Sequence, residues 1–451
     1  MANFDFSKRD SFGSKIGVIS AAAGSAIGLG NIWRFPYVAG ENGGGAFLLI
    51  YIGFILLIGV PVMLSEFAIG RRAQRNPYGA FRLLKPKQPW YLIGLMGIAA
   101  AFMILAFYST VAGWTLEYLI NAISNNYADK SPQDLSVMFD NFVSLGFKPV
   151  IFQLVFMFLT AWIVFSGVRH GIERYAKILM PVLLLIIIVL GIRSVTLQGA
   201  GAGLNFLFNP DFSKIDTSTI LEALGQAFFS LSIGMGTLIT YGSYINKKEN
   251  LSTTAFQVSA ADTAIAILAG VAIFPAMFAF GIEPNTSGEG LVFKILPLIF
   301  NEMPGGFAFQ LLFCFLLIVA ALTSTISVLE VVVAYFSEEL GIGRKLATVI
   351  AASAIGFLGI FCTLSFGPLR GLDLFEIFNF TSANILLPLG GLLIVVFVGW
   401  FLGKQNVYDE ISNSGILKMR LYKVFMIIVR FIAPVAIAMV FLHGMGIINL
   451  E

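Results

Sequence analysis

Long apolar runs separated by short polar stretches recur along the whole chain of 451 residues. Each run is long enough for a helix to cross a hydrocarbon core of about 30 Å, whereas the strands of a membrane barrel would alternate over segments of about ten residues. The pattern therefore predicts an all-α polytopic membrane protein. We expect eleven transmembrane helices, at residues 15–38, 44–70, 91–125, 150–167, 171–192, 219–246, 253–281, 306–340, 346–363, 373–402 and 421–445.

Two of these spans carry glycine pairs in their middle. The stretch "GSAIGLGNIWRFP" (24–36) lies in the first span, and "LSIGMGT" (231–237) echoes it in the sixth. Spans that are five apart start on opposite sides of the membrane, which is the arrangement of an inverted repeat of five plus five helices. Small residues also allow close helix packing, and that alternative stays open for either pair alone. Because both pairs occupy corresponding positions, we favour unwound helices 1 and 6.

An unwound segment inside a membrane exposes backbone groups that lipid cannot satisfy, so it must line a site for a polar ligand. Free carbonyls and half-helix carboxyl ends suit a cation such as Na⁺, and half-helix amino ends suit a carboxylate. A zwitterionic amino acid bound together with sodium would satisfy both. The "GLGNIW" segment could also be read as a dinucleotide fingerprint, but it lacks the third glycine and a preceding strand.

Composition excludes a soluble domain, because 58% of the residues are hydrophobic and only 12% are charged. Most Lys and Arg residues collect in alternate loops, so the positive-inside rule puts the N-terminus in the cytoplasm and the C-terminus outside. The polar start "MANFDFSKRD" has no signal core, and we expect no cleavage there. We divide the chain into a cytoplasmic segment (1–14), a first repeat (15–192), an extracellular loop (193–218), a second repeat (219–402), and helix 11 with the C-terminus (403–451).

Polar residues inside the spans are costly and are therefore candidates for function. "ALTSTISVLE" puts Thr323, Ser324 and Thr325 on the eighth span, where hydroxyls could bind a small cation or bond back to their own helix. Asp262 is a carboxylate early in the seventh span and needs a partner or a proton. The chain presents no pair of nucleophile and base, metal cluster or phosphate loop, so we do not expect an enzyme.

At these residues the sequence resembles the neurotransmitter:sodium symporter family along nearly its whole length. The block "GLGNIWRFPYVAGENGGGAF" (28–47) is close to the family signature, and "GQAFFSLSIGMGTLITYGSY" and "AALTSTISVLE" resemble its sixth and eighth spans. The resemblance implies a leucine-transporter-like fold and sodium-driven uptake of amino acids or amines. Animal members have twelve spans, so the chain is more similar to the eleven-helix bacterial subgroup that carries hydrophobic and aromatic amino acids, which implies an inner-membrane location.

Carried over residue by residue, the resemblance implies two sodium sites and one substrate site. The first sodium site would use Ala26, Asn31, Ser230 and Asp262. The second would use Gly24, Ile27, Ala320, Thr323 and Ser324. The substrate would lie against Ser25, Ala26, Gly28, Leu29, Gly30, Ile104, Tyr108, Phe229, Ser232, Met235, Thr325 and Val328.

Departures from the family pattern add two expectations. Animal members bind chloride beside a neutral residue at the position of Asp262, partly through positions that match Tyr51 and Gln226. A carboxylate at this position implies chloride-independent transport. The family pairs the arginine that matches Arg34 with an acid, but this chain has Asn379 there; Glu376 either takes over the pairing or the outer gate is a weaker hydrogen bond.

The matching inner-gate residues are Arg9, Phe12, Ser243, Tyr244 and Glu338, with Phe12 in place of the usual tryptophan. Span five contains "GIERYAKILMP", a glycine and a proline ten residues apart that either permit unwinding of its cytoplasmic half or simply kink the helix.

Animal amine carriers of the family have an aspartate near the position of Gly28, so the resemblance argues against amine substrates. It also implies that Ile104, Phe229, Met235 and Val328 make an apolar pocket. We therefore expect sodium-coupled symport of a hydrophobic, aromatic or large aliphatic L-amino acid by alternating access. The partners we expect are the amino acid, two Na⁺ ions and the bilayer, without nucleic acid, for a monomer or homodimer. A channel or a non-transporting amino-acid sensor is the alternative.

Overall fold

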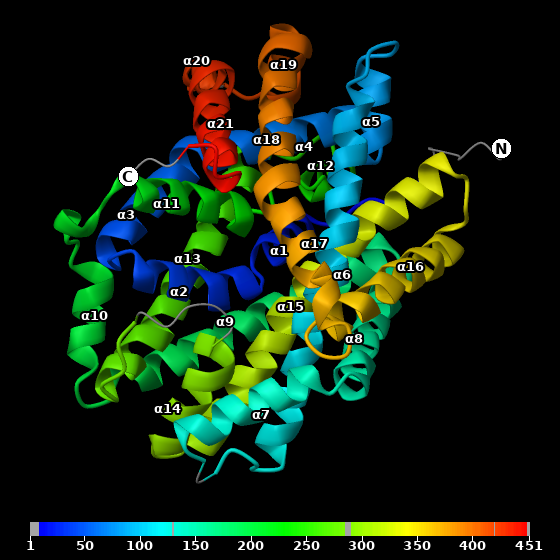
Figure 1. Ribbon diagram of the computed structural model, residues 1–451. Helices are drawn as coiled ribbons and strands as arrows, with labels where there is room; N and C mark the ends of the chain where they lie inside the picture. The colour runs from blue at the N-terminus through cyan, green and yellow to red at the C-terminus, as the bar shows by residue number, and fades with distance from the viewer. Residues whose placement is uncertain (1–8, 129, 285–289, 419, 449–451) are drawn as a thin grey trace.

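The computed structural model describes residues 9–128, 130–284, 290–418 and 420–448 (Figure 1). The predicted segment 1–14 and the C-terminal part of 403–451 therefore lie partly outside the described residues. Every regular element of the described part is helical. Nine of its helices are long and apolar enough to cross a membrane, and a pair bent by 52° at the first predicted span makes a tenth.

The first predicted repeat begins with the broken span, which consists of α1 (Lys15–Ala26), η2 (Gly30–Arg34) and α2 (Phe35–Glu41). The next four spans are α3 (Gly45–Phe54) continued through η3 (Ile55–Gly59) into α4 (Val60–Ala73), then α6 (Tyr91–Ile123), α8 (Phe147–Phe165), and η4 (Val168–Glu173) continued into α9 (Arg174–Val195).

The second predicted repeat begins with two short helices, α11 (Thr217–Ser230) and α12 (Thr237–Ser243), separated at the predicted break. The next three spans are single helices, α13 (Leu251–Ala279), α15 (Gly306–Glu339) and α16 (Arg344–Leu364). The tenth span consists of η7 (Arg370–Leu372), α17 (Leu374–Phe380), η8 (Thr381–Leu386), α18 (Leu387–Val396) and η9 (Phe397–Phe401). The last span consists of α20 (Tyr422–Ile427), η10 (Ile428–Ile432) and α21 (Ala433–Gly444).

Short helices that the hydrophobic pattern does not predict occupy the connections. They are α5 (Pro77–Leu84), α7 (Pro132–Ser144), α10 (Ala200–Phe208), η5 (Phe212–Lys214), η6 (Leu291–Ile295), α14 (Leu296–Glu302) and α19 (Lys404–Ile411). Local signals exist for some of them. Ser131 and Asp134 form a reciprocal capping box at the start of α7, and the Asn76 side chain caps α5.

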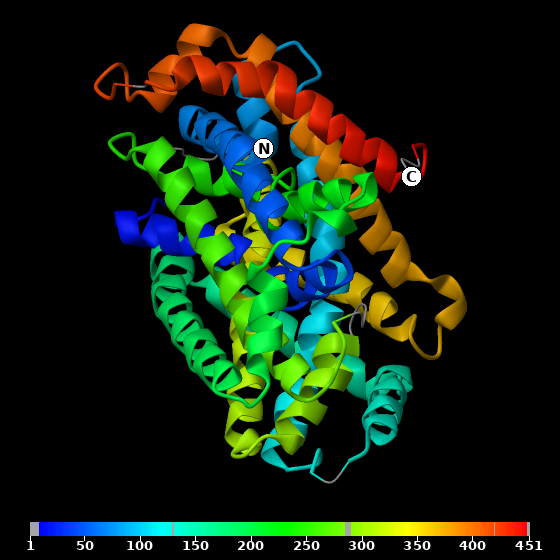
Figure 2. The same cartoon turned by 90° about the vertical axis from the view of Figure 1, so that its left-hand side faces the viewer.

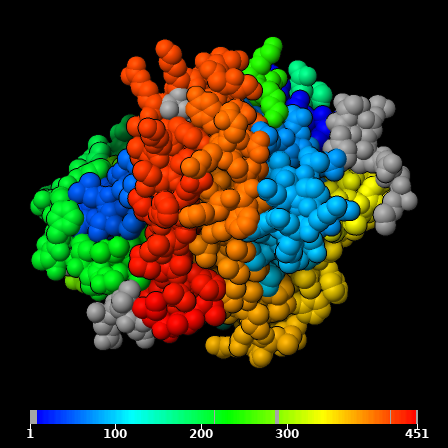
Figure 3. Space-filling model, turned by 90° about the horizontal axis from the view of Figure 1, so that it is seen from above, coloured from blue at the N-terminus to red at the C-terminus, as the bar shows by residue number. Residues whose placement is uncertain are grey.

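The broken spans lie at the centre of the molecule. Helix α1 packs against α9, α13 and α15, and α12 packs against α4. Helix α6 runs beside α15 and, with α8 and α16, forms a second group of packed helices. Figure 2 shows the last two spans, in orange and red, along the outside of the bundle. The space-filling view in Figure 3 shows these spans side by side across one face, in agreement with the packing of α18 against α21.

Candidate functional site

The break in the first span begins where α1 loses its own backbone hydrogen bonds. The amide of Gly28 donates to Asn31 Oδ1 at 3.2 Å, and the amide of Leu29 donates to the Tyr108 hydroxyl at 3.0 Å. In a continuous helix these two amides would donate to the carbonyls of Gly24 and Ser25. The break therefore releases two carbonyl oxygens near the middle of the membrane span.

The break in the sixth span lies beside the first. Ser232, Gly234 and Gly236 adopt positive φ angles of 55°, 86° and 77°, which ends α11 and sets the direction of α12. The Ser232 hydroxyl donates to the Ser25 carbonyl at 2.9 Å, so the two unwound segments contact each other directly. Within the second break, the Glu66 carboxylate accepts a hydrogen bond of 2.8 Å from the Gly234 amide.

A polar cluster surrounds Asp262, whose side chain is completely buried. Its carboxylate accepts hydrogen bonds from Asn31 Nδ2 at 2.7 Å and from the Ser230 hydroxyl at 2.8 Å, and the Tyr51 hydroxyl lies 3.3 Å away. Among the described residues, Asp262 forms no ion pair with Lys or Arg. An uncompensated buried carboxylate is costly, so this cluster is suited to a small cation. It brings together Asn31, Ser230 and Asp262, three of the four residues predicted for the first sodium site.

A second oxygen cluster lies between α1 and α15. The Thr323 hydroxyl is 3.4 Å from the Ile27 carbonyl and 3.0 Å from the Ala320 carbonyl, so three of the predicted ligands are neighbours. Gly24 closes this contact, since a Cβ atom there would lie 3.3 Å from both Thr323 and Met180. The Ser324 hydroxyl donates instead to the Ser25 carbonyl at 3.1 Å, on the side of Gly28.

The space between the breaks and α6 is narrow. A Cβ atom at Gly28 would lie 2.5 Å from the Ser324 hydroxyl oxygen and 3.1 Å from the Tyr108 hydroxyl oxygen. Ile104, Met235 and Val328, which are further predicted substrate residues, are buried. The Thr325 hydroxyl differs, because it contacts Thr160 of α8 at 2.9 Å and its own helix at Leu322.

A cavity of about 230 Å³ begins at Tyr108 and Phe229. Leu29 and Gly30 also line it, and the Phe229 ring lies 3.1 Å from the Cβ position of Gly30. The Arg34 guanidinium lies over the Phe229 ring, 4.7 Å from its centroid. The sequence reasoning missed further lining residues of this cavity, namely Trp33, Tyr37, Phe107, Val111, Phe375, Ala383 and Asn384. The sequence pattern gave no signal for them, because they are aromatic, aliphatic or polar residues of several different spans that meet only in the folded chain.

The two candidate partners of Arg34 differ in position. Asn379 lines the same cavity as Arg34, whereas the Glu376 side chain is exposed to the surroundings. Among the ion pairs of the described residues, none joins Arg34 to Glu376. This geometry favours the weaker, uncharged partner of the two that the sequence left open.

The predicted inner-gate residues surround one buried ion pair at the opposite end of the broken spans. Arg9 contacts the Glu338 carboxylate at 2.6 Å and donates to the Ser243 carbonyl at 3.0 Å. The Phe12 ring packs edge-on against Tyr244, and the Tyr244 hydroxyl donates to Glu330 at 2.6 Å. All five predicted inner-gate residues thus lie together.

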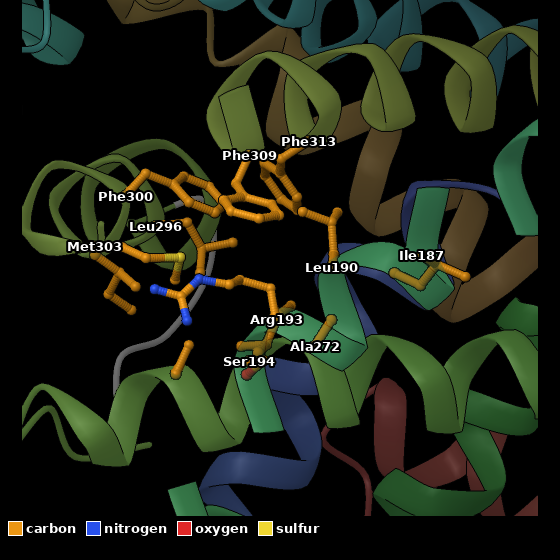
Figure 4. A pocket seen from close by; sticks show the side chains of 13 residues that line it. Ile187, Leu190, Arg193, Ser194, Ala272, Leu296, Phe300, Met303, Phe309 and Phe313 are labelled. Carbon is orange, nitrogen blue, oxygen red and sulfur yellow. The ribbon is translucent and has the colours of Figure 1, made fainter. Parts of the chain in front are cut away.

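Another cavity lies between α9, α13, α14 and α15, at one end of the bundle. Figure 4 shows the Arg193 side chain crossing toward Met303, with the rings of Phe300, Phe309 and Phe313 above it. The volume of this cavity is about 20 Å³, which is enough for a single water molecule. It is therefore too small in this conformation to hold an amino acid.

Comparison with known proteins agrees with this site. Residues 9–135 and 135–450 match the model of the sodium:neurotransmitter symporter family. The chain is 41% identical to the uncharacterized sodium-dependent transporter YhdH of Bacillus subtilis over 97% of this chain and 98% of that protein. It is 37% identical to an uncharacterized sodium-dependent transporter of Haemophilus influenzae over 97% and 98%.

The solved structures include a close match to the whole fold. The crystal structure of MhsT in complex with L-phenylalanine has 47% sequence identity and a TM-score of 0.89, and the match covers 97% of this chain and 100% of that chain. These similarities confirm the predicted family, fold class and non-enzymatic nature. The chain belongs to the sodium:neurotransmitter symporter family and is a sodium-dependent, multi-pass membrane transporter.

Proposed function

We propose that the chain takes up hydrophobic L-amino acids, aromatic or large aliphatic, together with two sodium ions. One observation carries this proposal. The break in the first span lies between a buried carboxylate that has no cationic partner among the described residues and the Tyr108 hydroxyl, which holds the Leu29 amide. The first feature suits a cation, and the second suits the carboxylate of an amino acid.

The first sodium ion would bind at the Asp262 cluster. The Ser230 hydroxyl supplies a neutral oxygen, Asp262 supplies the charge, and the Ala26 carbonyl lies at the end of α1. The Asn31 amide nitrogen donates to Asp262 in this conformation, so Asn31 would bind the ion through its Oδ1 atom, which accepts from the Gly28 amide. Hard oxygen ligands of this kind suit a small cation. The substrate carboxylate would complete the site, which couples sodium binding to substrate binding.

The second sodium ion would bind between α1 and α15. The Ile27 and Ala320 carbonyls already lie within 3.4 Å of the Thr323 hydroxyl, and the break leaves the Gly24 carbonyl without the Gly28 amide. We expect the Ser324 hydroxyl to rotate from the Ser25 carbonyl toward the ion. Such an ion would connect the broken first span to α15, which packs against α6, α8 and α16.

The side-chain pocket would be apolar. Gly28 leaves no room for an acid that could pair with a substrate ammonium group, because Ser324 and Tyr108 lie against it. Ile104, Met235 and Val328 are buried and apolar, and the unbranched Met235 adapts to different shapes. The name of the MhsT structure reports bound L-phenylalanine, which supports the same class of substrate for this chain.

Transport would be independent of chloride. The Tyr51 hydroxyl and the Ser230 hydroxyl both lie within hydrogen-bond distance of the Asp262 carboxylate. In a chloride-dependent transporter such hydroxyl donors would bind the chloride ion. In this chain the Asp262 carboxylate supplies the negative charge instead.

The cycle would alternate between two gates. In this conformation the Arg9–Glu338 pair closes one end, and the cavity above Phe229 leads to the other. Each sodium ion that enters down a potential of 100 mV contributes about 2.3 kcal/mol, so two ions can sustain a steep substrate gradient. We infer a cytoplasmic N-terminus in the cell (inner) membrane, repeats at 15–192 and 219–402, and a monomer or homodimer.

Binding of radiolabelled L-phenylalanine, L-tryptophan and L-leucine to the purified chain tests the proposal. We expect saturable binding in sodium that is lost in potassium and is the same in chloride and in gluconate. Uptake into proteoliposomes with a sodium gradient separates a symporter from a sensor or a channel. Binding without accumulation, or binding that ignores sodium, would overturn the proposal.

A further inference from the structure

A groove of about 440 Å³ lies between α8 and α16. These two helices pack against each other on one side of the bundle (Figure 1). Small side chains and large apolar side chains both line it. Phe158 and Trp162 on the α8 wall are 62% and 61% exposed, although both are aromatic. The groove faces away from the broken spans and takes no part in the proposed transport sites.

The length of the groove matches one leaflet of a bilayer. Its lining on α8 extends from Leu154 to Phe165, which at 1.5 Å per residue is about 16 Å. Half of a hydrocarbon core of about 30 Å is nearly the same length. On α16 the lining extends from Thr348 to Gly356, so the groove runs from near the middle of the span to the end at which α16 begins.

A cation lies at that end. Lys345 is exposed, and its Nζ atom lies 5.3 Å from the centroid of the Phe165 ring, the last lining residue of α8. Within the described part of the chain, Lys345 forms no ion pair. The neighbouring Arg344 is different, because the Glu330 carboxylate contacts it at 2.6 Å and neutralises it. A single available ammonium group thus lies at the membrane-surface end of an apolar groove one leaflet long.

We propose that this groove binds an anionic phospholipid, with one acyl chain along Ala161, Ala352 and Gly356 and the phosphate on Lys345. The apolar length and the terminal charge fit the two parts of such a lipid in the correct order. In the orientation inferred above, the lipid belongs to the cytoplasmic leaflet. The site goes beyond the proposed transport function, and neither depends on the other.

Quenching of tryptophan fluorescence by brominated lipids tests the site. The full chain is reconstituted into vesicles of phosphatidylcholine with either brominated phosphatidylglycerol or brominated phosphatidylcholine at equal mole fraction. We expect brominated phosphatidylglycerol to quench more strongly and Trp162→Phe to remove this excess. Trp400→Phe is the control, because Trp400 is also exposed but lies on the face formed by the last two spans.

Two pairs of variants test the parts of the groove. Lys345→Gln should reduce the preference for phosphatidylglycerol about fivefold, as expected for one cation near a membrane surface, and the preference should weaken in high salt. Lys423→Gln changes another exposed lysine and should have no effect. Gly356→Leu should fill the groove and remove the excess quenching, whereas Gly53→Leu adds the same side chain where nothing lies within 4 Å.

If Gly356→Leu does not fold, Ser353→Leu fills the same groove from an exposed position. Equal quenching by the two brominated lipids, or an excess that survives Trp162→Phe, would overturn the proposal. So would a groove-filling variant that converts a dimer to a monomer in light scattering, because a second copy of the chain would then be the occupant.

Discussion

The Glu173 carboxylate accepts a hydrogen bond of 2.7 Å from the Gly13 amide and thereby ties the start of α1 to the fifth span. The Ser14 hydroxyl, which caps α1, donates to the same carboxylate at 2.8 Å. Glu173 is buried and lies two residues after Gly171, within the segment whose glycine and proline indicate unwinding or a kink. Release of α1 and unwinding of the fifth span therefore involve the same carboxylate.

Glu173→Gln should favour the conformation that is open at this end. A hydrogen bond to a charged group contributes about 1.5–3 kcal/mol, so weakening the contact should increase the open population roughly tenfold or more. Hydrogen exchange at residues 13–26 and 171–181 should become faster together, and the apparent sodium affinity should fall. Glu302→Gln, at an exposed acid of α14, is the control. Faster exchange in only one of the two segments would show that they are not coupled.

Asp262→Asn should abolish chloride-free sodium binding or make it depend on chloride. The variant keeps the shape of the side chain but removes the only negative charge in the cluster of Asn31, Ser230 and Tyr51. We expect the apparent affinity for sodium, measured as the sodium dependence of substrate binding, to fall at least tenfold in gluconate. It should recover in part in chloride. Unchanged binding in gluconate would contradict both the first sodium site and chloride independence.

The breaks were predictable because two glycine pairs in apolar spans have few other physical reasons to exist. Ten of the eleven predicted spans correspond to helices of the described residues that are long and apolar enough to cross a membrane, if the bent pair is counted as one. The predicted sixth span does not, because α11 and α12 are both short. The Asp262 cluster could be anticipated from the cost of a carboxylate in a membrane, but its partner Asn31 follows only from the family resemblance. No periodicity in the sequence indicates that residues so far apart would meet.

Other features depend on rotamers and on distant contacts, which the sequence pattern does not encode. The choice between Glu376 and Asn379 required the direction of a helix face. The Ser324 hydroxyl contacts the Ser25 carbonyl, and the Thr325 hydroxyl contacts Thr160. The contact of Glu173 with the start of α1 was also not predicted, because an acid four residues before Lys177 is typical of an ordinary ion pair within one helix.

Gly28→Ala should weaken substrate binding strongly and leave the fold intact. The added Cβ would lie 2.5 Å from the Ser324 hydroxyl oxygen and 3.1 Å from the Tyr108 hydroxyl oxygen, so both must shift. Because overpacking costs about 1–3 kcal/mol, we expect L-phenylalanine affinity to fall about tenfold to a hundredfold. Gly53→Ala is the matched control, and an equal loss there would contradict the explanation.

Asn379→Asp should stabilise the closed state of the outer gate, whereas the variants above weaken binding. Asn379 and Arg34 line one cavity, and Arg34 already lies over the Phe229 ring. A carboxylate at residue 379 could pair with the guanidinium, which at a partly exposed site contributes about 0.2–1 kcal/mol. Dissociation of bound L-phenylalanine in sodium should therefore slow by up to about fivefold, most clearly at low ionic strength.

Glu376→Gln should leave the rate unchanged, because the Glu376 side chain is exposed and forms no ion pair with Arg34 in the described part of the chain. If Glu376→Gln speeds dissociation and Asn379→Asp has no effect, then Glu376 is the partner of Arg34 in the closed gate, and the helix that carries it must rotate as the gate closes.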